Sequence, residues 1–428
     1  MNNNDTIVAV ATPVGVGGIA VVRVSGNEAL LLIQRHLSVD TLQPRHATYC
    51  RFDDLDDGVA VYYPTGYTGE PTVEFSCHGS RYLQQAIVET LVADGARLAA
   101  PGEYTLRALL HGRLDLSQAE AVADLVDAAT PVQHRLAVSQ LRGGYAQALK
   151  NLRRQLLDLT ALLELELDFS QEDVEFADRC ELRRLISTLD IQLSTLIDSF
   201  ALGNALKRGI PVAIVGAPNV GKSSLLNALL QDDRAIVSPV AGTTRDTIEE
   251  TLTLDGITFR FIDTAGLRRT DDSVEVLGIE RSRRAVEQAA VVIYVHDATQ
   301  PWVAPDLPLE GKRLLVVHNK SDLAAAPADG IALSALTGAG LETLKEALLA
   351  TVQRPTDDVL LTNARHHEAL RRVQEALKQV QRGLDEGLPT DLVAVDLRDA
   401  LYHLGTITGD VTDDELLDNI FSRFCIGK

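Results

Sequence analysis

The chain has 428 residues, which is too long for one ordinary hydrophobic core, so we expect three domains. Hydrophobic residues make up 46% of the chain and charged residues 23%, which is typical of soluble globular proteins and excludes a disordered or fibrous chain. The formal net charge of −20 weighs against broad nonspecific binding to nucleic acid, because clustered Lys and Arg hold phosphate backbones. An RNA substrate would therefore need a local basic patch or a basic partner.

The N-terminal sequence has no basic start followed by an apolar signal core, and no apolar run elsewhere reaches the roughly 18 to 20 residues that span a bilayer. The four cysteines lie far apart, without a disulfide framework or a CxxC metal spacing, so we expect reduced thiols. Cys425 has no predicted base nearby, and we expect it to be a small buried residue rather than a nucleophile. These features favour a cytoplasmic protein that does not associate with membranes.

From Asp5 to about Leu110, short β-rich runs alternate with Gly and Pro turns around one helical stretch near 82–91, which predicts an α+β domain. Apolar residues then recur at helical spacing in two blocks, one before and one after an α/β segment. The clearest examples are Leu152, Leu156, Leu159, Leu163 and Leu167, and later Leu370, Val373, Leu377, Val380 and Leu384. The simplest architecture joins both blocks into one all-α domain with the α/β unit inserted.

Between the helical blocks, the runs PVAIVG, FRFIDTAG, VVIYVHD, LLVVHNKSD and IALSAL end in polar or Gly-rich loops, which indicates a parallel sheet wrapped by helices. We therefore divide the chain into an α+β domain (1–112), a first helical part (113–208), an α/β P-loop domain (209–354) and a second helical part (355–428). Ligands of such a sheet bind at the carboxyl ends of its strands.

The segment Gly216-Ala-Pro-Asn-Val-Gly221-Lys222-Ser223 fits the phosphate-binding pattern GxxxxGK[ST] between a predicted strand and a predicted helix. Its glycines let backbone N–H groups surround phosphates, Lys222 brings a positive charge to the β/γ oxygens, and the Ser223 hydroxyl suits Mg²⁺. A nucleoside triphosphate site is the prediction.

Three more motifs follow in the order that a GTPase needs. Asp263-Thr264-Ala265-Gly266 would lie near Mg²⁺ and the γ-phosphate, and Asn319-Lys320-Ser321-Asp322 would place the Asp322 carboxylate against the donor edge of guanine. Adenine would present an acceptor there, a mismatch of at least ~1–3 kcal/mol, so we expect GTP and not ATP. The expected GTP-binding residues are Asn219, Val220, Gly221, Lys222, Ser223, Ser224, Thr243, Thr244, Asp263, Thr264, Ala265, Gly266, Asn319, Lys320, Asp322, Ser334, Ala335 and Leu336.

The segment Gly242-Thr243-Thr244-Arg245-Asp246 has the place of a first switch. With Ser223, Thr244 is the better candidate for a Mg²⁺ ligand, although the sequence leaves Thr243 open. Leu267 follows the Asp-Thr-Ala-Gly motif, where Ras-like enzymes carry a Gln that positions water, so another group must orient the attacking water.

The chain resembles the MnmE/TrmE family of bacterial tRNA uridine-modification GTPases over its whole length. The most specific segments are DTIVAVATP, GGIAVVRVSG, TGEPTVEFSCHG, PGEYTLRALLHGRLDLSQAEAVADLVDA and the final FCIGK. The resemblance implies an N-terminal folate-binding and dimerising domain, a helical domain and an inserted G domain. It also implies a homodimer that joins an FAD-binding partner protein in a heterotetramer and modifies carbon 5 of the wobble uridine of tRNA.

The resemblance implies particular site residues as well. Asn219, Ser238, Val240 and Thr243 would bind a K⁺ ion that replaces an arginine finger, and Glu275 would orient the attacking water through a second water. A tetrahydrofolate derivative, 5-formyl or 5,10-methylene, would supply the carbon and would be held by Arg23, Glu74, Arg113 and Lys428. The apolar run from Leu416 to Phe424 would dock a final helix and carry Lys428 to that site.

Two rival functions remain open at this point. A GTPase of ribosome or RNA assembly would share the G domain, although the acidic charge and the FCIGK end argue against it. A scaffold that binds GTP without hydrolysing it is the second rival, and the intact Lys222, Thr244, Asp263 and Glu275 argue against that.

Overall fold

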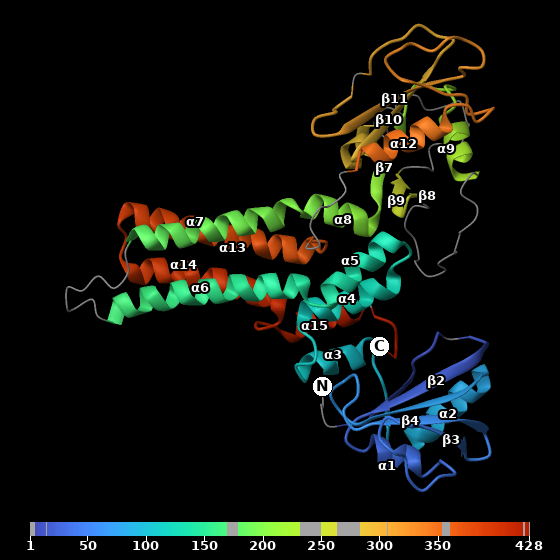
Figure 1. The fold of residues 1–428 in the computed structure, drawn as a ribbon, viewed down its shortest axis with the longest axis vertical. Coiled ribbons are helices and arrows are strands. Elements are labelled where there is room, and N and C mark those ends of the chain that lie inside the picture. The colour runs from blue at the N-terminus through green and yellow to red at the C-terminus, as the bar shows by residue number, and fades with distance from the viewer. Residues whose placement is uncertain are drawn as a thin grey trace. The chain divides into compact units, whose positions relative to one another are not determined.

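We analysed a computed structural model, which describes residues 5–13, 15–168, 179–231, 250–262, 283–305, 307–352, 360–422 and 424–427. The chain forms two compact units. The first comprises Met1–Asp127, Ala137–Leu193 and Glu368–Lys428, and the second comprises Ala128–Leu136 and Ser194–His367. The first contains an α+β domain followed by long helices, and the second contains an α/β domain, so the predicted multidomain fold class is confirmed (Figure 1).

The α+β domain is built on a six-stranded sheet of order β3-β4-β5-β2-β1-β6, in which only the β1–β6 pair is parallel. Alternating side chains such as Val22, Val24 and Phe75 are buried on one face, where α1 and α2 cover them. The helix predicted near 82–91 is α2. The elements are β1 (Ile7–Val10), β2 (Gly17–Ser25), α1 (Ala29–Gln34), β3 (Ala47–Phe52), β4 (Asp56–Tyr63), β5 (Thr72–Gly79), α2 (Arg81–Ala93) and β6 (Arg97–Leu98).

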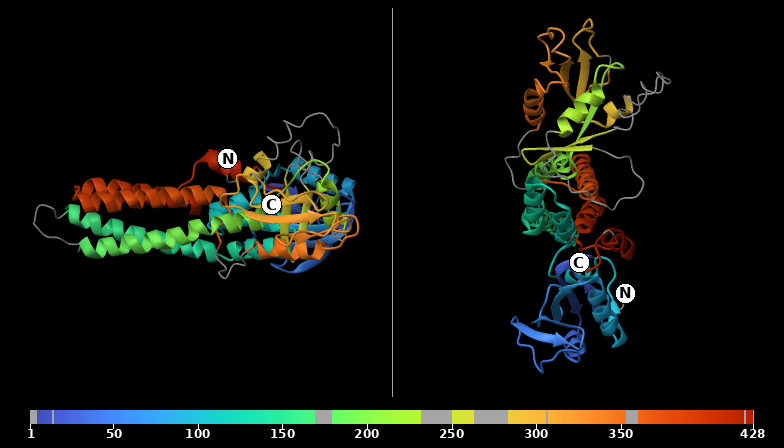
Figure 2. Two further views of the ribbon diagram at one scale, coloured as in Figure 1. Left: turned by 90° about the horizontal axis from the view of Figure 1, so that it is seen from above. Right: turned by 90° about the vertical axis from the view of Figure 1, so that its right-hand side faces the viewer.

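The helical domain takes its long helices from segments far apart in the chain, and they lie side by side in Figures 1 and 2. The predicted apolar stripes are buried, from Leu152 to Leu163 on α6 and from Leu370 to Leu384 on α13. Arg183 and Asp385 join α7 to α13, and Arg398 and Glu164 join α14 to α6. The helices are α3 (Glu103–Leu110), α4 (Leu116–Asp127), α5 (Pro131–Leu141), α6 (Gly144–Asp168), α7 (Arg179–Asp198), α13 (Ala364–Glu386), α14 (Thr390–Thr408) and α15 (Asp414–Phe421).

One stretch, Leu182–Arg208, is long and apolar enough to cross a membrane when only length and mean hydropathy are counted. It covers most of α7 and then α8 (Phe200–Arg208). The sequence predicts no apolar run long enough to span a bilayer, and this stretch is interrupted by Asp190 and Asp198. Leu182, Ile186, Leu189 and Leu193 are buried at heptad-like spacing, although only 17% of the apolar window is buried. A single helix of this kind is weak support for a membrane segment.

The α/β domain has a six-stranded sheet of order β12-β11-β10-β7-β9-β8 with buried apolar clusters on both faces. Its strands are parallel, as predicted, except for the edge strand β8, which pairs with β9 in antiparallel direction. Asp255 and Gly256, both at positive φ, form the turn between them, and this Asp-Gly hairpin signal was missed in the sequence. The elements are β7 (Ile210–Val215), α9 (Lys222–Gln231), β8 (Glu250–Leu254), β9 (Ile257–Phe261), β10 (Val291–Asp297), β11 (Arg313–Asn319), β12 (Ile331–Ala332) and α12 (Leu341–Ala350).

Candidate functional site

The GxxxxGK[ST] segment forms the loop between β7 and α9, where the sequence predicts a phosphate-binding loop. Asn219 has φ +61° and is exposed at the loop surface, and Val220 is buried beneath it. Lys222 begins α9 and donates hydrogen bonds from Nζ to the carbonyl oxygens of Gly216 (2.9 Å) and Ala217 (2.7 Å). Burial lowers the pKa of Lys222, because the ammonium group loses part of its hydration. A phosphate bound in the loop would favour the charged form again.

Asn319, at the end of β11, holds the loops of the site together. Its side chain is almost fully buried, with Nδ2 donating to the Val220 carbonyl (2.8 Å) and Oδ1 accepting from the Ala335 N–H (3.0 Å). A Cβ on Gly221, which has φ +96°, would lie only 2.2 Å from Asn319 Nδ2. The second glycine of the motif is therefore needed both for its backbone conformation and for this contact.

The predicted guanine-binding side of the site contains Lys320, Asp322 and the loop after β12. Lys320 has φ +62°, and its Nζ lies 2.5 Å from Oδ2 of Asp297. Asp322 is exposed, so its carboxylate is accessible to a ligand. Ser334 is buried, and its backbone N–H donates to the Ala339 carbonyl (2.9 Å), whereas Leu336 is 89% exposed.

Asp297, at the end of β10, is a residue of this site that sequence analysis missed. Burial alone would raise the pKa of its carboxyl, but hydrogen bonds from Lys320 and Thr299 prevail and lower it to about 2. Asp297 lies beside Asn319 in the β10–β11 register. The polar residue at the end of the run VVIYVHD was the signal that could have found it.

Several predicted site residues lie outside the described residues. They are Ser238, Val240, Thr243, Thr244, Asp263, Thr264, Ala265, Gly266, Glu275 and Lys428. The structure brings together Asn219 to Ser224, Asn319, Lys320, Asp322 and Ser334 to Leu336 at the carboxyl ends of β7, β11 and β12.

A second cluster lies in the α+β domain. Arg23 and Glu74 face each other across β2 and β5, and Arg23 Nε donates to Glu74 Oε1 at 2.8 Å. Arg23 also donates to the carbonyl of Gly427 (3.2 Å), and its guanidinium lies 5.4 Å from the centre of the Tyr104 ring. The fully buried Tyr104, which sequence analysis missed, donates its hydroxyl proton to the Arg23 carbonyl (2.7 Å).

The C-terminal segment reaches this cluster because α15 is docked. Phe421 and Phe424 pack with Leu106 and Leu116. Gly427 has φ +95°, and a Cβ there would lie 2.4 Å from the Val10 carbonyl oxygen, so the segment lies directly against β1. Cys425 is exposed, so the expectation that it is buried was wrong. Its carbonyl, not its side chain, faces the domain, where it accepts from the Gly102 N–H at 3.4 Å.

Arg113, the remaining predicted residue of this cluster, is exposed. Its side chain lies on the side of Gly69, where an added Cβ would come 3.4 Å from Arg113 Cγ. The structure therefore brings Arg23, Glu74 and Gly427 together, and within the described residues no hydrogen bond or ion pair joins Arg113 to them.

A phosphate loop after the first parallel strand and an Asn-Lys-x-Asp turn at the end of β11 define a P-loop G domain, so the protein is of the GTPase class. A family model described as MnmE helical domain matches residues 116–425, and one described as GTP-binding protein TrmE N-terminus matches residues 6–113. The chain belongs to the MnmE family.

Curated relatives named tRNA modification GTPase MnmE match the chain along its length. The protein of Porphyromonas gingivalis is 47% identical, with 100% of this chain and 98% of that protein covered. The protein of Christiangramia forsetii is 45% identical with 100% of both covered, and that of Parabacteroides distasonis is 46% identical with 99% and 100% covered. A solved G domain of the T. maritima FeoB iron transporter is 29% identical over 34% of this chain and 99% of that one, at a TM-score of 0.25.

Proposed function

We propose that this protein is a K⁺-dependent GTPase that acts with an FAD-binding partner to modify carbon 5 of the wobble uridine of tRNA. The product would carry an aminomethyl or carboxymethylaminomethyl group, with its carbon from 5-formyl- or 5,10-methylene-tetrahydrofolate. The observation that carries the proposal is the similarity over the whole chain to proteins named tRNA modification GTPases. That similarity includes the N-terminal and helical domains, so it rests on more than a shared G domain.

The phosphate half of the proposed reaction depends on the loop between β7 and α9. Lys222 already bonds to the carbonyls of that loop, so a triphosphate would exchange these bonds for bonds to its β/γ oxygens. The Ser223 hydroxyl, half-buried in the first turn of α9, suits a Mg²⁺ site with Thr244, and the ion would neutralise phosphate charge. Asn219, exposed in the loop, has an amide oxygen suited to K⁺, with Ser238, Val240 and Thr243.

Guanine selection would depend on Asp322, whose accessible carboxylate can accept from two N–H groups of the base edge. The backbone at Ala335 would meet the base oxygen, and Asn319 fixes that backbone by accepting its N–H. Glu275 would orient the attacking water, because Leu267 has no group that can do so.

The folate half would depend on the Arg23 cluster. A folate has an anionic glutamate tail and a pterin ring with donor edges, so its site needs cations for one and a carboxylate for the other. Arg23, Arg113 and Lys428 can supply the positive charge, and Glu74 the carboxylate. The contact between Arg23 and the Gly427 carbonyl supports this grouping, because it brings the residue before Lys428 to Arg23.

We further propose that the protein is a cytoplasmic homodimer that forms a heterotetramer with the flavoprotein, since this is the assembly implied by the family. The decisive experiment is nucleoside analysis of tRNA from cells that lack this protein. We expect the C5 modification of the wobble uridine to disappear and to return when the gene is restored. Unchanged modification would reject the proposal.

The GTPase part has a separate test. Phosphate release by the purified protein should be faster in K⁺ than in Na⁺ at equal ionic strength, because the ion must match its cavity to neutralise transition-state charge. Equal rates in the two salts would remove K⁺ from the proposal and leave the tRNA assignment standing.

A further inference from the structure

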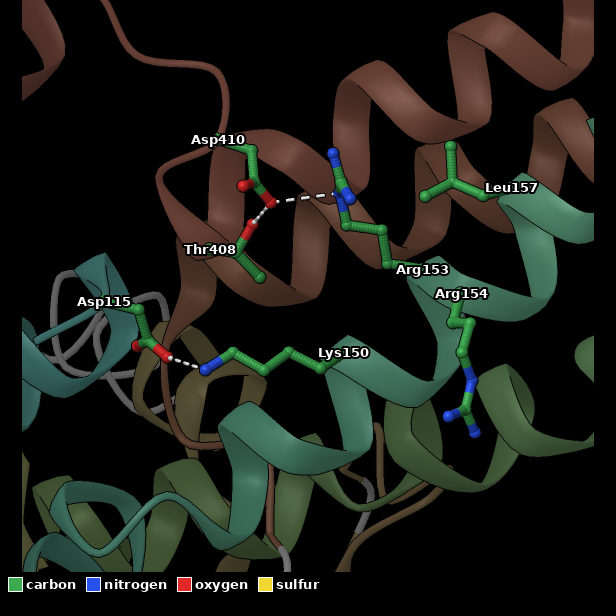
Figure 3. A pocket seen from close by; sticks show the side chains of 7 residues that line it. All are labelled: Asp115, Lys150, Arg153, Arg154, Leu157, Thr408 and Asp410. Atoms are coloured by element: carbon green, nitrogen blue, oxygen red, sulfur yellow. Dashed lines mark hydrogen bonds and ion pairs between the residues drawn. The ribbon is translucent and has the colours of Figure 1, made fainter. Parts of the chain in front are cut away.

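A cavity of about 290 Å³ opens in the helical domain between α6 and the end of α14, and its lining residues belong to neither site described above (Figure 3). Three cations, Lys150, Arg153 and Arg154, line it from one segment of α6. Their i, i+3 and i+4 spacing brings them onto neighbouring positions of the helix surface. Asp115 and Asp410 also line the cavity, so its three cations exceed its two carboxylates by one positive charge, in a chain whose net charge is −20.

The cations keep most of their hydrogen-bonding capacity. Arg153 contacts Asp410 Oδ2 through Nε (3.0 Å), and its other guanidinium nitrogens make no hydrogen bond to the described residues. Lys150 Nζ lies 3.5 Å from Asp115 Oδ2 and can donate three hydrogen bonds. Arg154 is exposed and, within the described residues, has no hydrogen-bond or ion-pair partner; Figure 3 shows its guanidinium directed away from Asp410. An anion could therefore bind without breaking either ion pair.

The cavity also contains a buried carboxylate oxygen, Asp115 Oδ2, with spare capacity to accept a hydrogen bond. Asp115 Oδ1 accepts from the Ser117 hydroxyl (2.7 Å) and the Gln118 N–H (2.9 Å), and so caps the start of α4. Asp115 Oδ2 is buried and has no hydrogen-bond partner among the described residues, apart from the ion-pair contact with Lys150. A buried carboxylate oxygen of this kind favours a ligand that brings a donor.

We propose that this cavity binds a ribose-phosphate unit of an RNA backbone. The cations at Lys150, Arg153 and Arg154 would take the phosphate, and Asp115 Oδ2 would accept a hydrogen bond from the 2′-hydroxyl. That hydroxyl is the donor that distinguishes RNA from DNA at a single site. The inference rests on the proposed function, in which tRNA is the substrate. The cavity would be a surface where an otherwise acidic chain can hold that RNA.

The first experiment removes positive charge from the cavity. The full-length variant Arg153→Gln/Arg154→Gln is compared with Arg372→Gln/Arg398→Gln, which loses the same charge at two exposed residues of α13 and α14. Affinity for an unmodified tRNA transcript is measured by fluorescence anisotropy between roughly 50 and 200 mM KCl. The cavity variant should bind roughly tenfold or more weakly, with a salt slope lower by about 2. The control should stay within about twofold of the wild type.

The second experiment tests the ribose contact. Asp115→Asn keeps the Oδ1 acceptor that caps α4 and replaces Oδ2, which contacts Lys150 at 3.5 Å, with an amide donor. Binding is compared for an RNA hairpin and a DNA hairpin of the same sequence. The wild type should prefer RNA, and Asp115→Asn should lose roughly tenfold of that preference, because one hydrogen bond to a charged acceptor is lost. Circular dichroism and basal GTP hydrolysis should match the wild type in all variants.

Equal tRNA affinity of the cavity variant and its control would overturn the proposal. An RNA preference that Asp115→Asn leaves unchanged would also overturn it. A third outcome is that Arg153 and Arg154 are needed for binding inorganic phosphate but not for binding tRNA. The cavity would then be an anion site unrelated to RNA, and this result would also overturn the proposal. The proposed function fails by a different result, unchanged wobble-uridine modification in cells lacking the protein, so the two failures can be told apart.

Discussion

The guanine-nucleotide site and the Arg23 cluster hold their polar groups in different ways. In the first, buried Asn319 bonds to two backbone loops, and Gly221 leaves the space for it. In the second, side chains meet across antiparallel strands, Arg23 opposite Glu74, and a chain end more than 400 residues away contacts Arg23. The positions of the polar groups in the first site depend on backbone conformation within short segments, whereas those in the second depend on packing between distant segments.

This difference decides how each site should respond to mutation. Removal of a group that acts only in the transition state of the nucleotide reaction should change turnover strongly and affinity little. In the Arg23 cluster, mutations at the distant C-terminal segment should lower ligand affinity, because that segment brings groups to the site from more than 400 residues away. The predictions below test this contrast, from the largest expected effect to the smallest.

Glu275→Ala should lower the kcat of GTP hydrolysis by roughly 10²- to 10⁴-fold, because a group that orients and polarises water contributes about that much. GTP affinity should change by less than about threefold, since the ground state does not use this group. Phosphate release and titration with a fluorescent GTP analogue measure the two quantities. A loss of affinity as large as the loss of turnover would make Glu275 a structural residue.

Deletion of Ile426 to Lys428 should abolish tetrahydrofolate binding, measured by calorimetry, while K⁺-stimulated GTP hydrolysis persists. Gly427→Ala should act in the same direction and weaken binding roughly tenfold, because the new Cβ would meet the Val10 carbonyl at 2.4 Å. Gly95→Ala is the matched control, since Gly95 also has positive φ (+112°) but has open space around its Cβ position. Undiminished folate affinity in the truncated protein would withdraw the chain end from the site and leave the GTPase assignment unchanged.

Much of the fold was predictable because it depends on local patterns. Buried stripes such as Leu152 to Leu163 and the strand runs of the parallel sheet have the periodicity of their elements. The roles of Asp297 and Tyr104 were not predictable, because they depend on which strand ends and helices become neighbours. Asp297 needs the β10–β11 register to reach Lys320, and Tyr104 needs α3 placed under β2.

Asp322→Asn should lower GTP affinity roughly 10- to 100-fold and allow xanthosine triphosphate to bind, because the amide offers a donor where guanine needs an acceptor. The nucleotides are compared by competition for one fluorescent analogue. Asp329→Asn serves as the control, since it removes a carboxylate from the same α/β domain, one that contacts His318 and not Lys320 or Asn319. Guanine selectivity that survives Asp322→Asn would mean that the base pocket lies elsewhere.

The smallest effect should come from Arg23→Lys, which keeps the positive charge and loses the planar fork that contacts Glu74 and Gly427 together. Tetrahydrofolate affinity should fall about three- to tenfold, corresponding to about 1 kcal/mol for weaker charge-assisted hydrogen bonding. Arg97→Lys is the control because Arg97 also pairs with carboxylates of this domain, Asp5 and Glu103, but does not contact the chain end. Both variants alter ion pairs of this domain, and calorimetry compares their thermal stability. Only Arg23→Lys should weaken folate binding. An equal loss of folate affinity in Arg97→Lys would show that any weakened ion pair in this domain has the same effect. The Arg23–Glu74 pair would then support the fold and not contact the ligand.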